Sequence, residues 1–339
     1  MKNTQPPRFA EGSLAHTLRD RFDRGQRPIL VGVAGDSGSG KTTYTEGIEW
    51  LLGADLVSQI SLDGYHKEDR ATRRQSGTSP LDPEANHLAQ AAADLAHLQQ
   101  GIAVDIPRYD HRHGQFLPPR RHTPTPVILI EGLHTLYSEF QPLLDFRIFV
   151  DSDVRVKRDW KFARDTQERG YAETEAESQI ASRVDEFEKW LADQQYASDV
   201  IVRIHPSTLG TLALDEVEDD GNDTCYHIEV IVTPNQLSQA SLYFPVDLST
   251  MTRQEALPFM LAMIPSRFQG HGVNVLHVDG HMPLAALDTL EDEIRQFIGK
   301  PVASVTNTAS SALPPTIRFA QMLVAWPFLG HLATPTSAA

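Results

Sequence analysis

The residues with the clearest chemical potential form a glycine-rich turn. Gly35 to Thr42 reads Gly-Asp-Ser-Gly-Ser-Gly-Lys-Thr and satisfies the pattern G-x-x-x-x-G-K-[ST]. In such a turn, successive backbone N–H groups point at a phosphate near the positive end of a helix. Lys41 would reach the β- and γ-phosphates. The expected nucleotide-binding residues are Gly35, Asp36, Ser37, Gly38, Ser39, Gly40, Lys41, Thr42 and Thr43.

A second acidic group is needed beside the phosphates to hold Mg²⁺ together with the Thr42 hydroxyl. The apolar run Val127–Ile130 ends in Glu131, and ligand sites in open parallel sheets lie at the carboxyl ends of strands. Glu131 is therefore expected to hold Mg²⁺ directly or through water. The alternative is an ordinary solvated glutamate at a strand end.

The next strand end provides an acceptor side. Asp63 would lie beside the glycine-rich turn, where a carboxylate can accept a proton from an attacking hydroxyl. His66 and Arg70 follow closely, and a guanidinium can bind a phosphorylated substrate. A capping aspartate with surface neighbours is the alternative. The chain has no N-K-x-D run, which weakens the hypothesis of a guanine-specific switch.

A charged segment from Lys157 to Gly170 follows a later strand. From composition alone it could be a solvated helix face with ion pairs at helical spacing.

The elements that must position these groups are predicted from apolar runs alternating with segments of helical spacing. This alternation predicts an α/β fold, with a parallel sheet flanked by helices. The clearest predicted helix is 83–100, with Asp82 as its cap and Gly101 at its end. The predicted strands are Ile29–Ala34, Leu56–Leu62, Val127–Ile130, Phe146–Val150 and Val200–Ile204.

The pattern changes after about residue 206. Strand-like runs at Tyr226–Val232, Leu242–Val246 and Val273–Val278 and an amphipathic segment at Ala285–Phe297 predict a smaller α+β extension. Phe319–Trp326 predicts a buried terminal helix that stops at Pro327. The expected organisation is a polar leader at 1–26, a core at 27–207 with a lid around 152–190, the extension at 208–300, and a linker with the terminal helix at 301–339.

Composition restricts the possible partners. A net charge of -15 over 339 residues disfavours nonspecific nucleic-acid binding. The single cysteine, Cys225, excludes an internal disulfide. The sequence begins without the apolar stretch of a secretory signal, and no run approaches the ~20 apolar residues of a membrane span. A cytoplasmic protein without membrane or nucleic-acid partners is expected.

Residues from Gly32 to about Pro206 resemble the phosphoribulokinase and uridine kinase family. Asp63-Gly64-Tyr65-His66-x-x-x-Arg70 is similar to the phosphoribulokinase version, and a weaker likeness to the longer plant and cyanobacterial form continues through Val273–Gly280 towards the end of the chain. Further similar segments are Leu81–Asn86, Pro107–His111 and Ile130–His134.

The resemblance implies an ATP- and Mg²⁺-dependent kinase of D-ribulose 5-phosphate, a homodimer that serves the Calvin cycle. It implies Asp63 as the base and Lys41, Lys161 and Arg164 as further catalytic residues. It also implies that Lys161, Arg164 and Arg169 belong to a basic lid that closes over the transferred phosphoryl group and excludes water. It implies a substrate site formed by Asp63, Tyr65, His66, Arg70, Tyr109, His111, Arg169 and Arg183.

Two rivals remain open at this point. One is a kinase for another acceptor, such as uridine or a different sugar phosphate, and the other is a nucleotide-binding regulatory module that transfers nothing. In photosynthetic relatives a cysteine within the glycine-rich turn takes part in thiol regulation. Here Ser39 stands at that position, so disulfide switching of the turn is not expected.

Overall fold

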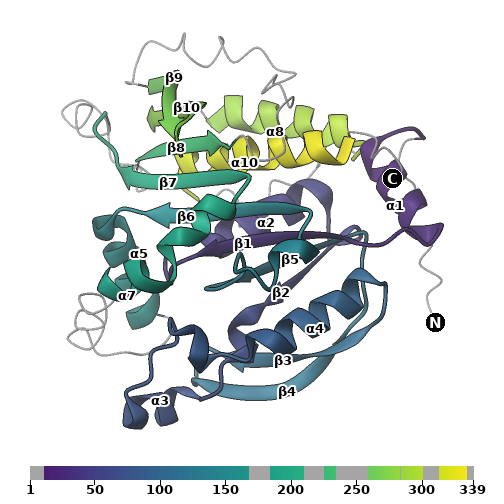
Figure 1. Ribbon diagram of the computed structural model, residues 1–339. Helices are drawn as coiled ribbons and strands as arrows, with labels where there is room; N and C mark the ends of the chain where they lie inside the picture. Colours follow the sequence, from purple (N-terminus) through teal and green to yellow (C-terminus); the bar gives the residue numbers. More distant parts are fainter. Residues whose placement is uncertain are drawn as a thin grey trace. The chain divides into compact units, whose positions relative to one another are not determined.

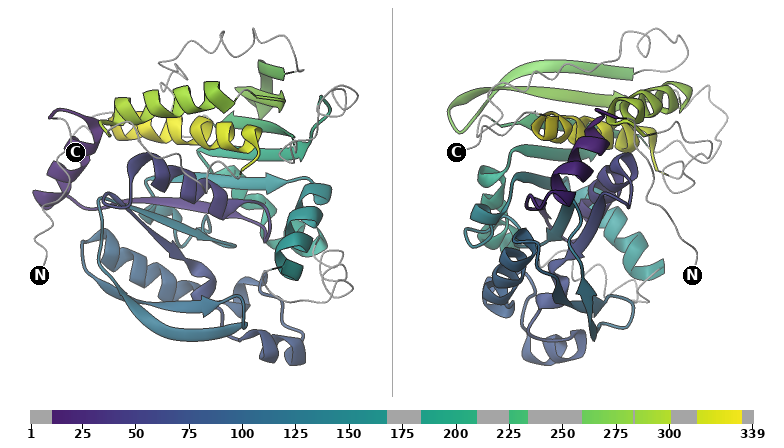
Figure 2. Two further views of the ribbon diagram at one scale, coloured as in Figure 1. Left: turned by 180° about the vertical axis from the view of Figure 1, so that it is seen from behind. Right: turned by 90° about the vertical axis from the view of Figure 1, so that its right-hand side faces the viewer.

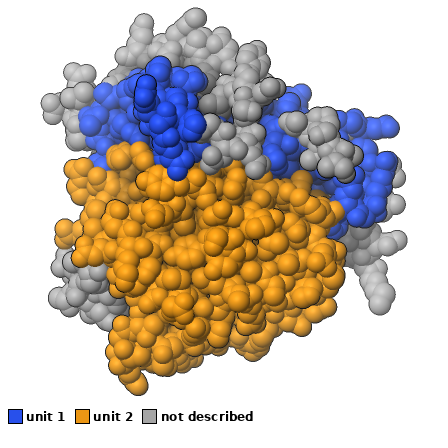
Figure 3. Space-filling model, viewed as in Figure 1, with its two compact units in different colours: residues 1–26, 46–58, 206–339 blue, residues 27–45, 59–205 orange. Residues whose placement is uncertain are grey.

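The computed structural model describes residues 11–167, 184–209, 225–233, 259–282, 284–300 and 313–333. The chain forms two compact units, shown in different colours in Figure 3. One unit comprises residues 27–45 and 59–205, and the other comprises residues 1–26, 46–58 and 206–339. We call them the core unit and the extension unit.

The core unit is built on a parallel sheet with the strand order β2-β5-β1-β6-β7 (Figure 1). Strand β1 pairs in parallel with β5 and β6, and β6 pairs in parallel with β7. These strands are nearly continuous apolar runs because both faces of a parallel sheet are covered. The predicted α/β fold is confirmed. The strands are β1 (Ile29–Gly35), β2 (Val57–Ser61), β5 (Val127–Gly132), β6 (Phe146–Ser152) and β7 (Val200–Pro206).

The helices that flank the sheet are mostly short. A prediction made from the sequence is wrong in one of them, since the segment 83–100 is not one helix. Asp82 caps a 3-10 turn that ends at Ala85, Asn86 is extended, and a new helix starts at Leu88. The break allows Asn86 to pair with His66 in an isolated bridge. The elements are α2 (Lys41–Leu52), η1 (Leu62–Tyr65), α3 (Arg70–Ser76), η2 (Pro83–Ala85), α4 (Leu88–Gln99), η3 (Gln141–Leu143), α5 (Val154–Gln167), α7 (Val184–Trp190) and η4 (Ala192–Ala197).

A two-stranded antiparallel ribbon lies outside the main sheet and beside α4 (Figure 1). It comprises β3 (Val104–Asp110) and β4 (Gln115–His122), with an irregular register between Ile106 and Arg108. No strand was predicted here, because prolines such as Pro107 argue against regular pairing. A free-standing ribbon tolerates proline where the ladder is already broken.

The extension unit contains an antiparallel sheet with the order β8-β10-β9. Helix α8 confirms the amphipathic segment at 285–297, and it lies beside α10 in both views of Figure 2. A helix also forms within the polar leader, where Ser13 caps its first turn. The elements are α1 (Leu14–Asp23), β8 (Tyr226–Val232), β9 (Phe259–Phe268), β10 (His271–Gly280), α8 (Leu284–Ile298) and α10 (Pro315–Ala333).

Helix α10 corrects a second prediction, because it continues through Pro327 to Ala333. A proline in a helix interior removes one hydrogen bond and crowds the preceding turn. Phe328 and Leu329, just beyond it, are nevertheless fully buried. We infer that this packing outweighs the local cost. Leu242–Val246 and the linker at 301–312 lie outside the described residues. In the part of the chain that the structure describes, no helix is long and apolar enough to span a bilayer.

Candidate active site

The glycine-rich turn connects β1 to α2, as the sequence predicts for a phosphate-binding loop. Gly38 and Gly40 have φ angles of 83° and 95°, which favour glycine. A Cβ atom on Gly38 would lie 3.2 Å from Cβ of Lys161, and one on Gly40 would lie 3.1 Å from the Trp160 ring. The loop therefore lies closely against α5, and glycine at these two positions makes that close approach possible.

Lys41 lies within this loop. Its Nζ atom donates a hydrogen bond of 2.7 Å to the backbone oxygen of Asp36. The ammonium group is thus held across the turn, at the position where a phosphate would meet the loop. On the other side of the loop, the Ser152 hydroxyl at the end of β6 donates to the backbone oxygen of Ser39 at 3.0 Å. The glycine-rich loop and the Lys41 ammonium therefore fit the phosphates of a nucleoside triphosphate.

Thr42 and Glu131 come together as expected for a magnesium site. The Thr42 hydroxyl donates to Oε2 of Glu131 at 2.9 Å. Glu131 follows the buried part of β5, and its register partner on β1 is Val33. One hydroxyl and one carboxylate suit Mg²⁺, which keeps several waters and takes few protein ligands. These two oxygens could hold the ion beside Lys41.

Asp63 is placed at the carboxyl end of β2 by the short turn η1. The Ser61 hydroxyl accepts a hydrogen bond of 3.4 Å from the backbone N–H of Asp63. Gly64 follows, and a Cβ atom there would collide with the backbone oxygen of Pro107. The turn and the β3–β4 ribbon can therefore approach each other only because residue 64 is glycine.

Two histidines surround the Asp63 carboxylate. His111 Nε2 lies 3.0 Å from Oδ2, and His66 Nε2 lies 3.8 Å from Oδ1. Burial would raise the pKa of Asp63, but the hydrogen bond from His111 and the positive charges of His66, His111 and Lys41 together hold that pKa well below its ordinary value. Asp63 is therefore ionised at neutral pH and lies within electrostatic reach of the phosphate-binding lysine.

The orientation of His66 is fixed by Asn86. The Asn86 side-chain nitrogen donates to the backbone oxygens of Pro80, at 3.1 Å, and Asp82, at 2.7 Å. Its oxygen therefore faces Nδ1 of His66, at 2.7 Å, and Nδ1 carries the proton. Burial lowers the pKa of His66.

The β3–β4 ribbon and α3 bring further groups to this cluster. Tyr109 contacts the rings of His66 and His111 edge to face, at centroid distances of 5.6 and 5.1 Å. The Arg73 guanidinium donates to the Tyr109 hydroxyl at 2.9 Å, and the Arg70 guanidinium donates to the backbone oxygen of His111. Two cations therefore flank the Asp63 cluster, and Arg73 was not predicted.

The remaining lid residue that the structure describes also meets the loop. Lys161 is only 4% exposed and lies on α5, against Gly38. Its neighbour Lys157 binds Asp151 at 2.7 Å, lies 3.8 Å from the Asp36 carboxylate, and places its ammonium 4.0 Å from the centre of the Phe187 ring. The solvated-face alternative is thus wrong for these two lysines.

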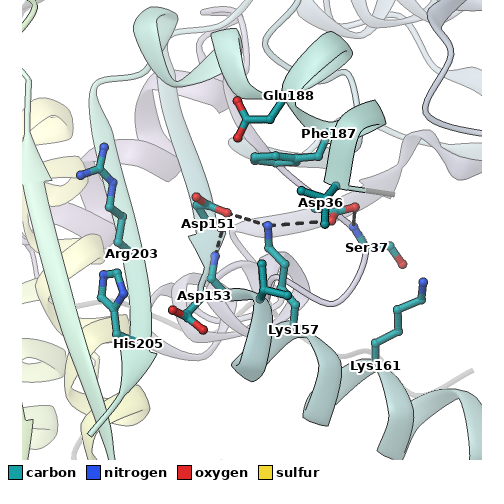
Figure 4. Close-up of a pocket in the computed structure, with 13 residues that line it drawn as sticks. Asp36, Ser37, Asp151, Asp153, Lys157, Lys161, Phe187, Glu188, Arg203 and His205 are labelled. Carbon is teal, nitrogen blue, oxygen red and sulfur yellow. Dashed lines mark hydrogen bonds and ion pairs between the residues drawn. The ribbon is translucent and has the colours of Figure 1, made fainter. Parts of the chain in front are cut away.

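These residues border a cavity of about 260 Å³ (Figure 4). Asp36 and Ser37 of the glycine-rich loop form part of its wall, and Arg203 and His205 of β7 form another part. The cavity adjoins the loop, so it can accept the part of a nucleotide that extends beyond the phosphates.

Other predicted site residues lie apart from this cluster or cannot be placed. Tyr65 is buried, and its hydroxyl donates to Asp94 of α4 at 2.9 Å, so that hydroxyl already has a partner within the protein. Arg169, Arg183 and the side chain of Arg164 lie outside the described residues. Arg73 and the roles of Asn86 and Lys157 were not predicted from the sequence. Asn86 and Lys157 stand within segments named from the sequence, whereas no pattern indicated Arg73.

Residues 30–209, more than half of the chain, match the family described as phosphoribulokinase / uridine kinase. This chain belongs to that family. Its glycine-rich loop, Asp63 cluster and Thr42–Glu131 pair all lie within the matched residues. The prediction of family membership is confirmed.

Individual members of the family give the extent of the likeness. A phosphoribulokinase of Synechocystis is 36% identical over 184 residues, which are 54% of this chain and 55% of the relative. The chain therefore spans about half the length of that relative. A uridine kinase of Deinococcus deserti is 34% identical over 148 residues, 42% of this chain and 72% of the relative.

A solved family structure supports the fold. The phosphoribulokinase from Rhodobacter spheroides superposes with a TM-score of 0.52 at 18% identity, covering 81% of this chain and 98% of the other. The likeness extends beyond the family match at residues 30–209 and includes much of the extension unit's length. At this identity it is evidence for the fold alone.

Proposed function

We propose that this protein transfers the γ-phosphoryl group of ATP to the O1 hydroxyl of D-ribulose 5-phosphate, giving ribulose 1,5-bisphosphate and ADP. The observation that carries the proposal is the ionised Asp63 carboxylate, which lies among His66, His111 and Lys41. A nucleotide switch needs no carboxylate for an acceptor, whereas a kinase of alcohols does.

On the nucleotide side, the glycine-rich loop and Lys41 bind the phosphates of ATP. Thr42 and Glu131 would hold Mg²⁺, which neutralises charge on the phosphate oxygens when it is bound. Lys157 ties the loop to the end of β6 through Asp36 and Asp151. Lys161 approaches the same loop from α5, where its ammonium can stabilise the transferring group.

On the acceptor side, the O1 oxygen attacks the γ-phosphorus while the bond from that phosphorus to the bridging oxygen of ADP breaks. The hydroxyl proton passes to Asp63. Because the transition state of phosphoryl transfer is loose, a carboxylate of low pKa suffices to orient the hydroxyl and to accept its proton late.

The flanking cations favour an acceptor that already carries a phosphate. Arg70 and Arg73 reach the cluster from α3, and a guanidinium binds phosphate in a bidentate manner. We further propose that Arg164, Arg169 and Arg183 close over the bound substrates as parts of a lid. A neutral nucleoside would offer Arg70 and Arg73 no phosphate to bind.

Two alternatives are distinguishable from this proposal. Family membership also includes kinases of uridine, so a kinase of uridine or of another sugar phosphate is one alternative. A nucleotide-binding regulatory module would keep the ATP site without transferring phosphate. The ionised Asp63 favours phosphoryl transfer over a regulatory role. The two arginines Arg70 and Arg73 favour a sugar phosphate over uridine as the acceptor.

An acceptor panel tests the proposal. The purified protein is incubated with Mg-ATP and, in separate reactions, ribulose 5-phosphate, ribose 5-phosphate, uridine or glycerate, and ADP release is followed. We expect rapid release with ribulose 5-phosphate alone. Turnover with another acceptor would support a kinase activity but would contradict ribulose 5-phosphate as its substrate. Tight ATP binding without turnover on any acceptor would favour the regulatory module.

A further inference from the structure

Three potential metal ligands gather on the antiparallel sheet of the extension unit. Glu229 on β8 is directly opposite His277 on β10. His227 lies two residues before Glu229, so its side chain leaves the same face of the strand. His227 Nε2 lies 3.0 Å from His277 Nδ1, which lies 3.9 Å from Oε1 of Glu229. All three donor atoms fall within 4.8 Å of one another.

We propose that His227, Glu229 and His277 form a binding site for a divalent transition metal ion of the zinc class. Bonds of 2.0–2.2 Å in tetrahedral geometry separate neighbouring donor atoms by about 3.4 Å. The separations of 3.0 and 3.9 Å lie on either side of this value. Small rotations of the side chains would therefore bring the donors to the geometry of a bound ion.

The chemistry of the donors determines the class of ion. Two neutral imidazoles and one carboxylate suit Zn²⁺, Co²⁺, Ni²⁺ or Cu²⁺. Mg²⁺ and Ca²⁺ prefer oxygen ligands, so they are poor competitors for this site. The site is thus chemically distinct from Thr42 and Glu131, whose two oxygens suit Mg²⁺. A protein that uses Mg²⁺ could hold a zinc-class ion at the same time.

The surroundings of the cluster fit an ion held at a fixed position. The side chains of His277 and Glu229 are only 15% and 21% exposed. The next register pair on this face, Ile231 and Val275, is buried. An apolar border restricts the access of water and strengthens the attraction between the ion and its ligands. Because the strand ladder fixes the backbone of all three residues, binding would order side chains alone.

Three protein ligands leave a fourth position for water or another ligand. The ligands come from two paired strands, so a bound ion would tie β8 to β10. Any ion that binds the folded state selectively raises the stability of that state. We therefore expect the ion to stabilise the extension unit, and none of its three ligands belongs to the candidate active site.

The test is a titration of the full-length protein, stripped of metal, with Co²⁺ in the presence of millimolar Mg²⁺. We expect one ion per chain, with the visible absorption of a four-coordinate cobalt site that Zn²⁺ then displaces. His227→Gln and Glu229→Gln should each weaken metal binding at least about tenfold. A tenfold loss is the lower end of the range for residues that only support the ligands of a metal, so loss of a ligand itself should cost at least as much. His271→Gln is the control, because His271 is an exposed histidine of β10, the strand of His277, and lies outside the cluster.

The melting temperature gives an independent result. Zn²⁺ should raise it in the unmodified protein and in His271→Gln, and the rise should be lost in His227→Gln. Far-UV circular dichroism of the ion-free variants shows whether they are folded, and two separate ligand variants guard against the failure of one. Absence of stoichiometric binding would overturn the proposal. Unaltered affinity in folded ligand variants would also overturn it, because the ion would then occupy another place.

Discussion

Asp63 stays ionised because positive groups surround a carboxylate that burial alone would protonate. His111 makes the direct hydrogen bond, at 3.0 Å, while His66 and Lys41 contribute through their charges. The same lysine binds the phosphates in the proposed reaction. The charge of Lys41 therefore assists both the nucleotide side and the acceptor side of the site. The groups around Asp63 set the range of pH over which its carboxylate can act as the base.

Replacing His111 should change that range. His111→Ala removes a hydrogen bond and a charge that both lower the pKa of Asp63, so that pKa rises towards or above its ordinary value near 4. The acid limb of kcat/KM should then move to higher pH. The measurement is a pH–rate profile with ribulose 5-phosphate varied. His113→Ala is the control, since His113 pairs with Asp110 instead. If the acid limb of kcat/KM falls at the same pH in the unmodified protein, His111→Ala and His113→Ala, this role of His111 is ruled out.

Lys157 should act as a positioning residue for the nucleotide loop. Lys157→Met removes the links to Asp36 and Asp151 but retains the length of the side chain. Loss of a charged link of this kind costs on the order of 1.5 kcal/mol, or about tenfold in ATP affinity. We expect a higher Kd for ATP and an unchanged KM for the acceptor.

Calorimetric titration with ATP measures the first quantity, and steady-state kinetics measures the second. Arg155→Met is the matched control on the same helix, because Arg155 is exposed and pairs with Asp153. Equal effects of Lys157→Met on ATP and acceptor would contradict a role confined to the nucleotide loop.

At the scale of elements, the central strands could be predicted, and the ribbon that completes the site could not. Long apolar runs such as Ile29–Gly35 indicate buried parallel strands wherever they occur. Tyr109 lies on β3 and His111 in the turn that follows it. The ribbon contains prolines and is only partly buried, so neither periodicity nor propensity marked it as strand. The resemblance to a family named these residues, but only the folded ribbon explains why they meet Asp63.

The break between η2 and α4 could not be predicted from local sequence signals either. Asp82, Pro83 and Gly101 are correct signals for a helix start and stop, and the sequence between them has helical composition. The bridge between Asn86 and His66 interrupts it because a tertiary contact outweighs local propensity. Arg73 illustrates the limit at residue level, since an arginine on a short exposed helix has no distinctive spacing.

The segment after β5 should make folding sensitive to pH. His134 is buried and its Nε2–H donates to the backbone oxygen of Leu81 at 2.8 Å. Burial lowers its pKa from 6.5 to about 4. Between about pH 6.5 and pH 4, His134 is therefore protonated in the unfolded chain but not in the folded chain. The free energy of unfolding falls as the pH is lowered through this interval.

This loss amounts to about 3 kcal/mol for His134. His134→Asn keeps a donor for Leu81 without a titratable group, so its free energy of unfolding should fall less steeply over the same interval. Denaturant titrations at several pH values provide the measurement, and His97→Asn, on an exposed position of α4, is the control. A slope in His134→Asn as steep as in the unmodified protein would show that other groups dominate.

At the scale of the whole molecule, the acidic net charge does not describe the charges gathered at the proposed site. The chain carries -15 overall, yet the proposed site brings together Lys41, Lys157, Lys161, Arg70 and Arg73. Nearby charges act over about a Debye length of 8 Å in physiological salt. Local arrangement therefore matters more than net charge when a protein binds a triphosphate and a sugar phosphate.

The extension unit has a buried ionic centre of its own. Glu291 accepts hydrogen bonds from Trp50 and from Arg318, whose Nη2 lies at 2.6 Å. Both charged side chains are less than 10% exposed. Arg318→Met would leave Glu291 buried with a net charge, which costs about 3–5 kcal/mol of stability.

Replacing both charges, as Glu291→Leu with Arg318→Met, should restore much of that loss, because buried ion pairs often exchange for apolar groups at little cost. Chemical denaturation of the single and double variants measures the difference. Arg267→Met on β9 is a control with an exposed arginine. A single variant as stable as the unmodified protein would contradict the importance of this centre.

The central claim concerns phosphoryl transfer to ribulose 5-phosphate with Asp63 as the base. Its most direct test is the turnover of Asp63→Asn with Mg-ATP and ribulose 5-phosphate, measured together with the Kd for ATP. The account predicts a fall in kcat of about 10²- to 10⁴-fold, with little change in ATP affinity, because the amide keeps the shape but cannot accept the proton. Near-normal turnover by a folded Asp63→Asn variant would contradict it.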